Sequence, residues 1–309
     1  MNYVIIADVN CDLVTELRQR FDVDYLKGHI VINGEEHATD LDRELFKTPE
    51  EYYAVFNAKG AKLSTSPAST GETVAKFEEY LSKGIDVIYF ALSSALSGSY
   101  NFALMAKKEC DEKYPDRKVT VIDSLRYGTA LGLLVAKCGE LRLNGASYEE
   151  VVKFAEENKH RIHQMGPMDD LFYLAKAKRI SKGKAFMGTL IGVKPLGDFN
   201  REGKAEVLIK GKGIKNAIDI TINYIKRTIV NPSEQIVFVS DTNRKENAAL
   251  IKERIEKEIQ PKEVIYVSCA PAGATNIGPG LACAYYFGEP ISENNDVERK
   301  IIEEVAAKK

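Results

Sequence analysis

Two hydroxyl-rich segments contain the residues of this sequence that are best suited to bind a ligand. Ser93 and Ser94 follow Ile85–Ala91, an apolar run that predicts a buried strand, and they precede a predicted helix. Thr65 and Ser66 lie in a second segment of the same kind. Serine and threonine hydroxyls donate hydrogen bonds without carrying a charge. With no obvious base beside them, these four residues suit the binding of an anionic head group better than the breaking of a bond.

Helix capping is the alternative role for hydroxyl residues in such segments. It accounts for Ser97, Ser69 and Thr70, which stand where helix N-caps belong. It does not account for the four residues named above, because they lie further from the predicted helix starts. We therefore predict that those four contact the ligand. We also expect the amide groups at the start of the following helix to favour an anion.

Three aspartates end or follow predicted strands. Asp8 ends the first strand, Asp12 follows it by four residues, and Asp123 ends a later strand. Such carboxylates could act as a general acid and base, or they could bind a metal ion. The sequence shows no clustered ligand spacing. We therefore favour a structural interpretation, in which Asp12 is a helix N-cap and Asp8 binds loop amides.

The segment Asn276-Ile-Gly-Pro-Gly280 lies between two apolar runs and allows two interpretations. Gly278 and Gly280 either form a tight turn with special backbone angles or let a ligand approach the backbone. In the second case Asn276 would add an amide donor to the ligand site. The residues alone leave both interpretations open.

The order of predicted elements indicates two domains. Apolar strands alternate with amphipathic helices through residues 1–150, which predicts an α/β domain with a doubly wound parallel sheet. Residues 151–290 mix hairpin-like strands with long helices, which is typical of an α+β domain. Residues 291–309 are rich in charge and are predicted to form a C-terminal tail, with a marginal helix as the alternative. Open parallel sheets bind ligands beyond the carboxyl ends of their strands, where Ser93 and Ser94 are expected.

Composition narrows the possible partners and setting. The chain has 309 residues, with 43 basic against 45 acidic side chains, which gives no electrostatic reason to expect nucleic acid and allows at most transient membrane contact. No apolar run approaches the roughly 20 residues that span a bilayer. The start of the chain lacks the basic segment of a signal peptide, and the 5 scattered cysteines favour a reducing, cytoplasmic setting.

Over about residues 3–288 the sequence resembles the DegV family of bacterial fatty-acid-binding proteins. The resemblance rests on seven short segments in the family order rather than on any one of them. These segments are Ile6-Ala-Asp-Val-Asn-Cys-Asp-Leu13, Thr65-Ser-Pro-Ala-Ser69, Ser93-Ser-Ala-Leu-Ser-Gly-Ser-Tyr100, Val121-Ile-Asp-Ser124, Arg179-Ile-Ser181, Lys194-Pro-Leu196 and Asn276-Ile-Gly-Pro-Gly280.

The resemblance implies a two-domain, DegV-like fold and a function in bacterial lipid transport and phospholipid metabolism. A long-chain fatty acid would lie in a buried apolar tunnel between the domains, and a separate fatty acid kinase would phosphorylate it. The chain itself would be non-catalytic and would need no cofactor or metal. The ligand-binding residues implied are Thr65, Ser66, Ser93, Ser94, Asn276 and Gly278.

The sequence departs from the family pattern at three places. Asn276 stands where the family usually has histidine, and Pro67-Ala68 replaces a Gln-Pro pair. Ala177-Lys-Arg-Ile180 replaces Gly-Gly-Arg-Ile. Asparagine can donate a hydrogen bond to an oxygen, as histidine can, but only histidine can carry a charge.

A hydrolase or transferase of acyl or phosphoryl groups is the alternative function. Its nucleophile would be Ser94 or Ser97, with a distant His29 or His163 folded into place as the base. His160 and His163 also have a spacing found at metal sites, but no third ligand accompanies them, so we expect them on a solvated surface.

Overall fold

The computed structural model describes residues 2–180 and 192–307 and divides the chain into two compact units. Unit 1 comprises the residues up to Lys159 together with Ala270–Thr275, and unit 2 comprises His160–Cys269 and the residues from Asn276 onward. The boundary predicted at residue 150 falls inside helix α6 (Tyr148–Asn158), which buries Val151 and Ala155 within unit 1. The chain crosses between the units three times, which a linear division of the sequence does not anticipate.

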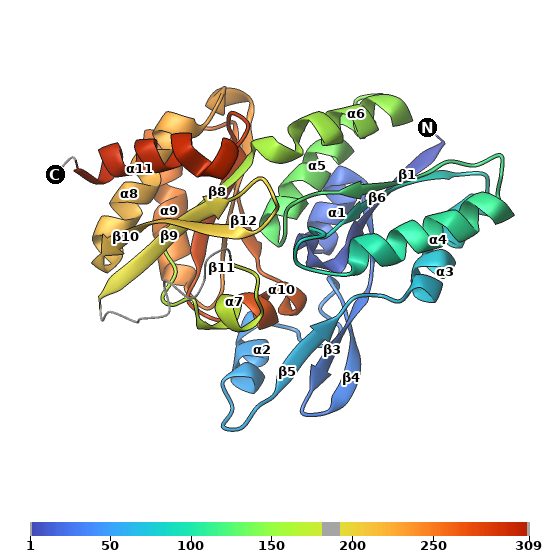
Figure 1. Cartoon of the computed structure of the whole chain (residues 1–309), viewed down its shortest axis with the longest axis horizontal. Helices are drawn as coiled ribbons and strands as arrows, with labels where there is room; N and C mark the ends of the chain where they lie inside the picture. Colours follow the sequence, from blue (N-terminus) through green and yellow to red (C-terminus); the bar gives the residue numbers. More distant parts are fainter. Residues whose placement is uncertain (1, 181–191, 308–309) are drawn as a thin grey trace. The chain divides into compact units, whose positions relative to one another are not determined.

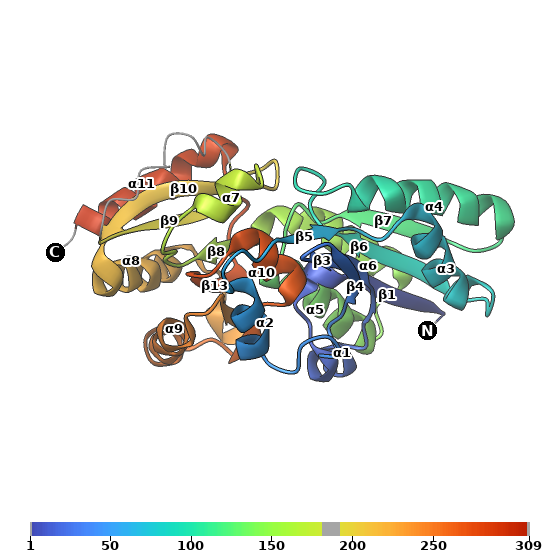
Figure 2. The ribbon, with the colours of Figure 1, turned by 90° about the horizontal axis from the view of Figure 1, so that it is seen from below.

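The centre of unit 1 is a four-stranded parallel sheet in the order β2-β1-β6-β7. Val87 and Tyr89 point from β6 toward helices α3 and α4, while α1 and α5 cover the opposite face (Figures 1 and 2). The predicted doubly wound parallel sheet is therefore confirmed. The bounds are β1 Tyr3–Asp8, β2 Asp24–Leu26, β6 Asp86–Ala91, β7 Val119–Asp123, α1 Thr15–Phe21, α3 Thr70–Leu81, α4 Ser99–Lys113 and α5 Thr129–Leu143, with a 3-10 turn at Val9–Cys11.

Helix α5 packs unusually close to its neighbours through two glycines. A Cβ atom at Gly132 would overlap the carbonyl oxygen of Cys11, and one at Gly139 would overlap that of Phe21. The two glycines are seven residues apart and therefore lie on one face of the helix. Most of α5 is buried, so the two glycines bring the helix close to its neighbours in the interior of unit 1.

Unit 1 also contains a three-stranded antiparallel sheet, in the order β4-β3-β5. The sequence predicted only an extended segment, Val23–Ile32, ending at the Asn33-Gly34 turn. That turn is confirmed as the hairpin joining β3 to β4, with positive φ at both residues. The bounds are β3 Gly28–Ile32, β4 Glu35–Thr39 and β5 Leu63–Ser66, and helix α2 is Pro49–Phe56.

Unit 2 combines a mixed sheet, in the order β12-β11-β13-β8, with the hairpin β9–β10. Only β11 and β12 are parallel, so this unit has the predicted α+β character. The strands are β8 Ile162–Met165, β9 Val193–Phe199, β10 Ala205–Lys212, β11 Ile236–Asp241, β12 Glu263–Ser268 and β13 Ala282–Phe287. The helices are α7 Phe172–Lys176, α8 Gly213–Thr228, α9 Lys245–Glu258 and α11 Asp296–Ala307, and α10 (Pro271–Ile277) begins in unit 1 and ends in unit 2. Short 3-10 turns lie at Lys159–Arg161, Pro232–Glu234 and Glu293–Asn295.

The C-terminal segment differs from the charged tail that its composition predicts. It folds into α11, and Ile302 and Val305 are buried in the hydrophobic core of unit 2. Their spacing of three residues forms an apolar stripe among charged neighbours, and this stripe packs against α8 and β10.

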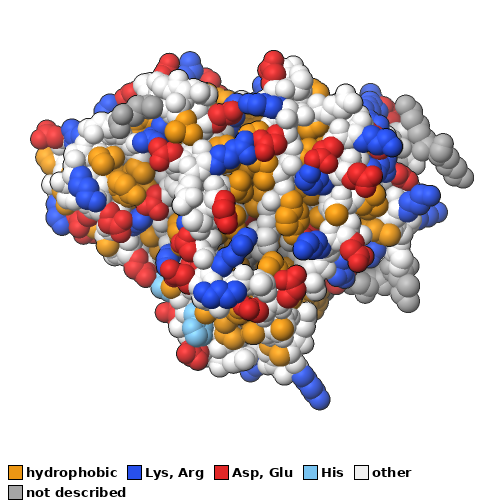
Figure 3. Space-filling model, turned by 180° about the vertical axis from the view of Figure 1, so that it is seen from behind, with side chains coloured by type: hydrophobic (Ala, Val, Ile, Leu, Met, Phe, Trp, Pro, Cys, Tyr) orange, Lys and Arg blue, Asp and Glu red, His pale blue; other side chains and the backbone are white. Residues whose placement is uncertain are grey.

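Charge is mixed over the surface rather than separated. On the face shown in Figure 3, basic and acidic side chains are interspersed, in keeping with the near balance of 43 and 45 charged residues. Within residues 2–180 and 192–307, no helix combines the length and apolar character needed to cross a membrane.

Replacing Gly132 with alanine should lower the free energy of unfolding by about 1–3 kcal/mol, because the added methyl group overlaps the Cys11 backbone. Gly71→Ala in α3 is the matched control, since a Cβ there meets nothing within 4 Å. That variant should be neutral or more stable by up to about 1 kcal/mol. Urea unfolding measures both, and equal effects of the two substitutions would contradict the packing argument.

Candidate functional site

The two hydroxyl segments meet at the carboxyl edge of the parallel sheet in unit 1. Ala68, which follows Thr65-Ser66, belongs to the same hydrophobic cluster as Ala91, the last residue of β6. A Cβ at Gly28 would contact both the Ser66 carbonyl oxygen and the side chain of Val9, which follows β1. These contacts place both segments at the same edge of the sheet. Open parallel sheets commonly bind their ligands at this edge.

The side chains of Thr65 and Ser66 project from opposite faces of β5. Thr65 pairs with Ile30 of β3, and Ser66 pairs with His29, so each shares a face with its partner. Ile30 is fully buried, whereas His29 contacts the carboxylates of Glu36 and Glu72 on the outer side. The hydroxyl of Thr65 therefore faces the interior of unit 1, and that of Ser66 faces its surface.

The backbone of the segment from Ser93 to Ser97 forms a closed turn. Four of its N–H groups have acceptors within unit 1, so the backbone of the turn is held in a defined conformation. Helix α4 begins at Ser99, close to the predicted start, and a role of its amide groups in anion binding stays a prediction. The four bonds run from Ser93 N to Arg126 O (3.0 Å), from Ser94 N to Asp123 Oδ1 (3.1 Å), and from Leu96 N and Ser97 N to Ser93 O (3.0 and 3.2 Å).

Asp123 and the residues after it hold this turn in place. The Asp123 carboxylate accepts from the N–H groups of Ser94 and Leu125, and Ser124 Oγ donates to the Ala91 carbonyl at 2.7 Å. Arg126 is fully buried and supplies the acceptor for Ser93 N. Sequence reasoning missed Arg126, because arginine is rarely buried and nothing in its local pattern signals such a place.

The buried and exposed serines of this turn differ in what they can do. Ser93 is fully buried, while Ser94 is exposed. Ser97 Oγ accepts from the Ser99 N–H and lies 3.1 Å from Ser99 Oγ. Ser97 therefore pairs with an N–H group at the start of α4, but the N-cap residue itself is Gly98 and not Ser97. Ser69 is confirmed as the N-cap of α3, and Thr70 is the first helical residue instead.

Ser69 forms a capping box with Glu72 immediately after the Thr65-Ser66 segment. The Glu72 carboxylate accepts from Ser69 and lies 3.0 Å from His29 Nε2. Hydrogen bonds from Ser69 are the main reason that the pKa of Glu72 lies below its usual value. Glu72 therefore anchors the start of α3 and, through His29, the strand that pairs with β5.

The aspartates at the sheet edge have structural partners. Asp8 accepts from the N–H and the side-chain amide of Asn10, as predicted. Asp12 is not a helix N-cap: it is fully buried with φ of 59°, and it accepts from Thr129 Oγ1 and Ala270 N, both at 2.9 Å. Within the described ranges, 2–180 and 192–307, no group of three or more His, Cys, Asp or Glu residues is arranged to hold a metal.

Asn276 and Gly278 belong to unit 2, at the end of α10 and the start of the following loop. Gly278 has φ of 76°, and a Cβ there would overlap the ring of Tyr173. Gly280 has φ of 118° and presses against Asp169. The tight-turn interpretation therefore accounts for both glycines, and a ligand contact at Asn276 or Gly278 stays a prediction.

Asp169 fixes this loop by pairing with a lysine of β9 and with an arginine just before α9. Its carboxylate binds Lys194 Nζ at 2.6 Å and Arg244 Nε at 2.6 Å. Burial raises the pKa of Asp169, but the hydrogen bonds from Lys194 and Arg244 outweigh that effect and hold the pKa below its usual value. The loop is thus fixed by a charged group that stays ionised at neutral pH.

A family model described as an uncharacterised protein of the DegV family matches residues 2–288 of this chain. The chain belongs to the DegV family. A DegV domain-containing protein of Clostridium perfringens is 31% identical over 287 residues, which cover 93% of this chain and 98% of the relative. The resemblance inferred from seven short segments is thereby confirmed, although Ser181, the end of one segment, lies outside the described residues.

Solved structures of DegV proteins confirm the fold. DegV of Bacillus subtilis, described as a fatty acid binding protein, is 26% identical with a TM-score of 0.78, and the match covers 94% of this chain and 100% of that one. A DegV lipid binding protein of Thermotoga maritima is 23% identical with a TM-score of 0.81, covering 94% and 99% of the two chains.

Nucleophilic chemistry finds little support in this DegV protein. His29 contacts Glu36 and Glu72, and both ring nitrogens of His163 are engaged inside unit 2, by Asp198 and by the Glu289 carbonyl. The expectation that His163 lies on a solvated surface was wrong, because it is 2% exposed. At the sheet edge, burial raises the pKa of the Cys11 thiol to about 12, so this cysteine is protonated and a poor nucleophile at neutral pH.

Removing the Asp123 carboxylate should loosen the serine turn. In Asp123→Ala, the amide protons of Ser94 and Leu125 should exchange with solvent at least about tenfold faster, because each loses a charged acceptor. Asp123→Asn keeps an acceptor oxygen and should show a smaller change. Amide exchange followed by NMR measures this, and unchanged exchange in the alanine variant would show that Asp123 does not hold the turn.

Proposed function

We propose that this DegV-family chain binds a long-chain fatty acid in an apolar tunnel and presents its carboxylate to a separate fatty acid kinase. The observation that carries the proposal is the pair of hydroxyl segments at one edge of the sheet. Thr65 and Ser93 place neutral hydroxyl groups there, and the neighbouring N–H groups of the serine turn have acceptors within unit 1. Such a site orients an anionic head group and leaves the bond-making chemistry to another protein.

The energetics of a fatty acid suit a weakly charged head-group site. Burying an acyl chain of about 16 carbons at about 0.8 kcal/mol per methylene contributes roughly 12 kcal/mol before costs. Association and ordering take back several kcal/mol of this gain. The affinity therefore comes from the chain, and hydroxyl donors can hold the carboxylate without a tight ion pair that would hinder its phosphorylation.

The known relatives support the ligand class. The Bacillus subtilis relative, whose chain is matched over its full length, is described as a fatty acid binding protein. Asn276 departs from the histidine usual in the family and cannot carry a charge, so Thr65 and Ser93 take a larger share of head-group binding here. We propose that the chain does this work as a non-catalytic cytoplasmic carrier of bacterial phospholipid metabolism.

The serine-nucleophile alternative is less well supported. Ser97 Oγ is engaged by Ser99, and Ser94 N is held by Asp123 in a turn whose described contacts bring no histidine. A hydrolase needs a base within hydrogen-bond reach of its nucleophile. We therefore assign Ser93 and Ser94 to binding.

Thr65→Ala should weaken fatty acid binding about tenfold or more, because it removes a hydrogen bond to a charged group worth roughly 1.5–3 kcal/mol. Ser66→Ala is the matched control, one residue away and on the opposite face of β5, and it should change affinity by less than about twofold. Displacement of a fluorescent fatty acid measures both.

Equal losses in the two variants would contradict the orientation of Thr65, and no loss in either would contradict the head-group assignment. Circular dichroism should show that both variants fold, since neither side chain is buried.

The purified chain should carry about one fatty acid in native mass spectrometry and do no chemistry on it. With ATP, magnesium and fatty acid it should form no acyl-phosphate, because the sequence lacks a Walker A loop and the Asp123 carboxylate beside the serine turn already accepts two backbone N–H groups. Adding a cognate fatty acid kinase should start the reaction. Turnover by the chain alone, abolished by Ser94→Ala or Ser97→Ala, would establish the enzyme alternative instead.

A further inference from the structure

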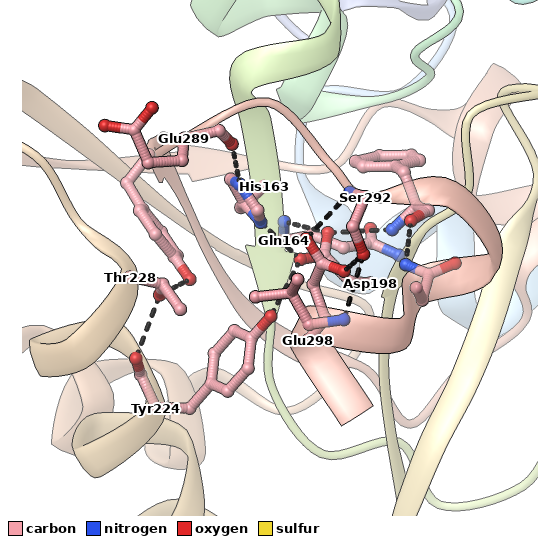
Figure 4. A network of polar contacts seen from close by, with 12 residues as sticks. His163, Gln164, Asp198, Tyr224, Thr228, Glu289, Ser292 and Glu298 are labelled. Atoms are coloured by element: carbon pink, nitrogen blue, oxygen red, sulfur yellow. Dashed lines mark hydrogen bonds and ion pairs between the residues drawn. The ribbon is translucent and has the colours of Figure 1, made fainter. Parts of the chain in front are cut away.

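A buried polar network in unit 2 is not used by the proposed fatty acid site. It centres on His163 in β8 and Asp198 in β9, which are 2% and 0% exposed (Figure 4). His163 Nδ1 lies 2.6 Å from Asp198 Oδ2, and His163 Nε2 lies 2.8 Å from the main-chain oxygen of Glu289. The histidine thus joins β8 and β9 to the segment that follows β13.

The two partners of His163 fix its protonation. A main-chain carbonyl only accepts hydrogen bonds, so Nε2 must donate to Glu289. Asp198 also accepts from the N–H groups of Gln164 and Phe199, at 2.9 and 2.7 Å, which is the surrounding of an ionised carboxylate. Nδ1 must therefore donate as well, and a ring that donates from both nitrogens is an imidazolium.

Other titratable groups surround the pair of His163 and Asp198, and they come from the elements packed against it. Tyr286 of β13 stacks on the imidazole with ring centroids 5.5 Å apart, and Tyr224 of α8 donates to Asp198 at 3.4 Å. Burial raises the pKa of both tyrosines well above the usual value, so both stay neutral below pH 10. Cys283 of β13 is held neutral by burial in the same way, and Glu298 of α11 completes the set.

Residues 288–298 depend on this network for their position. Gly288 packs so tightly that a Cβ would lie 2.7 Å from His163 Cδ2. Ile291 N donates to His160 O, and the Asn295 side chain donates to Phe199 O, the residue after Asp198. Ser292 binds the carboxylate of Glu298 at the start of α11. The contacts run without a break from the imidazolium to the C-terminal helix.

Helix α11 lies beyond the part of the chain that the family model describes, which ends at residue 288. It docks on unit 2 through Ile302 and Val305 and through Arg299, which binds Glu206 and the carbonyl of Val207 in β10. The segment before α11 is tied to unit 2 at several points, and the contact of His163 with Glu289 O is one of them.

We propose that His163 is a proton-controlled latch that holds the C-terminal helix α11 on unit 2. With the proton in place, the imidazolium donates to Asp198 and to Glu289 O together. When the proton leaves, one ring nitrogen presents a lone pair to an acceptor in a buried site, and that contact becomes repulsive.

The direction of the pH effect follows from the network. The folded pair holds a proton that an unfolded histidine loses near pH ~6.5. Docking of α11 is therefore fully stabilised below that pH, and the stabilisation is lost as the pH rises through the higher value at which the buried pair gives up its proton.

Two NMR measurements on the full chain test the latch. In the wild type at pH 7, the ring nitrogens of His163 should both carry protons. Between pH 6 and 9, the protection factors of α11 amides, which already correct for the intrinsic rise of exchange, should fall about tenfold or more, while amides in α8 keep theirs.

His163→Gln should lower α11 protection already at pH 6 and remove its further fall with pH, because glutamine does not titrate. His37→Gln, at a histidine of β4 in unit 1, is the matched control and should behave as the wild type. A neutral His163 ring at pH 7, or α11 protection that is constant with pH in the wild type, would overturn the proposal. Should His163→Gln fail to fold, these two wild-type measurements decide the question alone.

Discussion

Carboxylates that accept backbone N–H groups govern the architecture of the candidate site. The loops that leave the carboxyl edge of the parallel sheet carry donors that must find acceptors away from water. Asp12 receives Ala270 N and thereby ties a distant part of the sequence to unit 1, while Asp123 receives Ser94 N and Leu125 N. Once these donors are satisfied, the turns are rigid, and the hydroxyls that remain are held in defined directions.

Because the carboxylates at this edge accept backbone N–H groups, the edge suits binding rather than catalysis. Acidic groups that might act as bases are occupied by backbone amides, as Asp8 is by Asn10. Serine and threonine hydroxyls are neutral donors, and such donors can orient an anionic oxygen without pairing tightly with it. A carrier that hands its ligand to another protein needs this kind of site, since the apolar chain supplies the affinity.

Unit 2 also contains polar groups that are held by hydrogen bonds, but they serve a different structural purpose. Its buried polar groups do not face a ligand site but connect strands to the segment before α11. Polar groups in an apolar interior depend on their partners, because each unsatisfied member is costly. In the latch that we propose, the proton of His163 acts on a helix that lies more than a hundred residues away in the sequence.

The local sequence was sufficient to predict the parallel sheet, the capping role of Ser69 and the position of the Ser93 turn, because strand length, helix caps and turns depend on near neighbours. It was also sufficient, through seven ordered segments, for the family. It did not predict that Thr65 and Ser66 face opposite ways, because facing depends on which strand β5 pairs with. It placed His163 on the surface and α11 in a tail, because their burial comes from partners such as Asp198 and β10 that only the tertiary structure brings near. Contacts between residues far apart in the chain decided these points, and no local pattern encodes them.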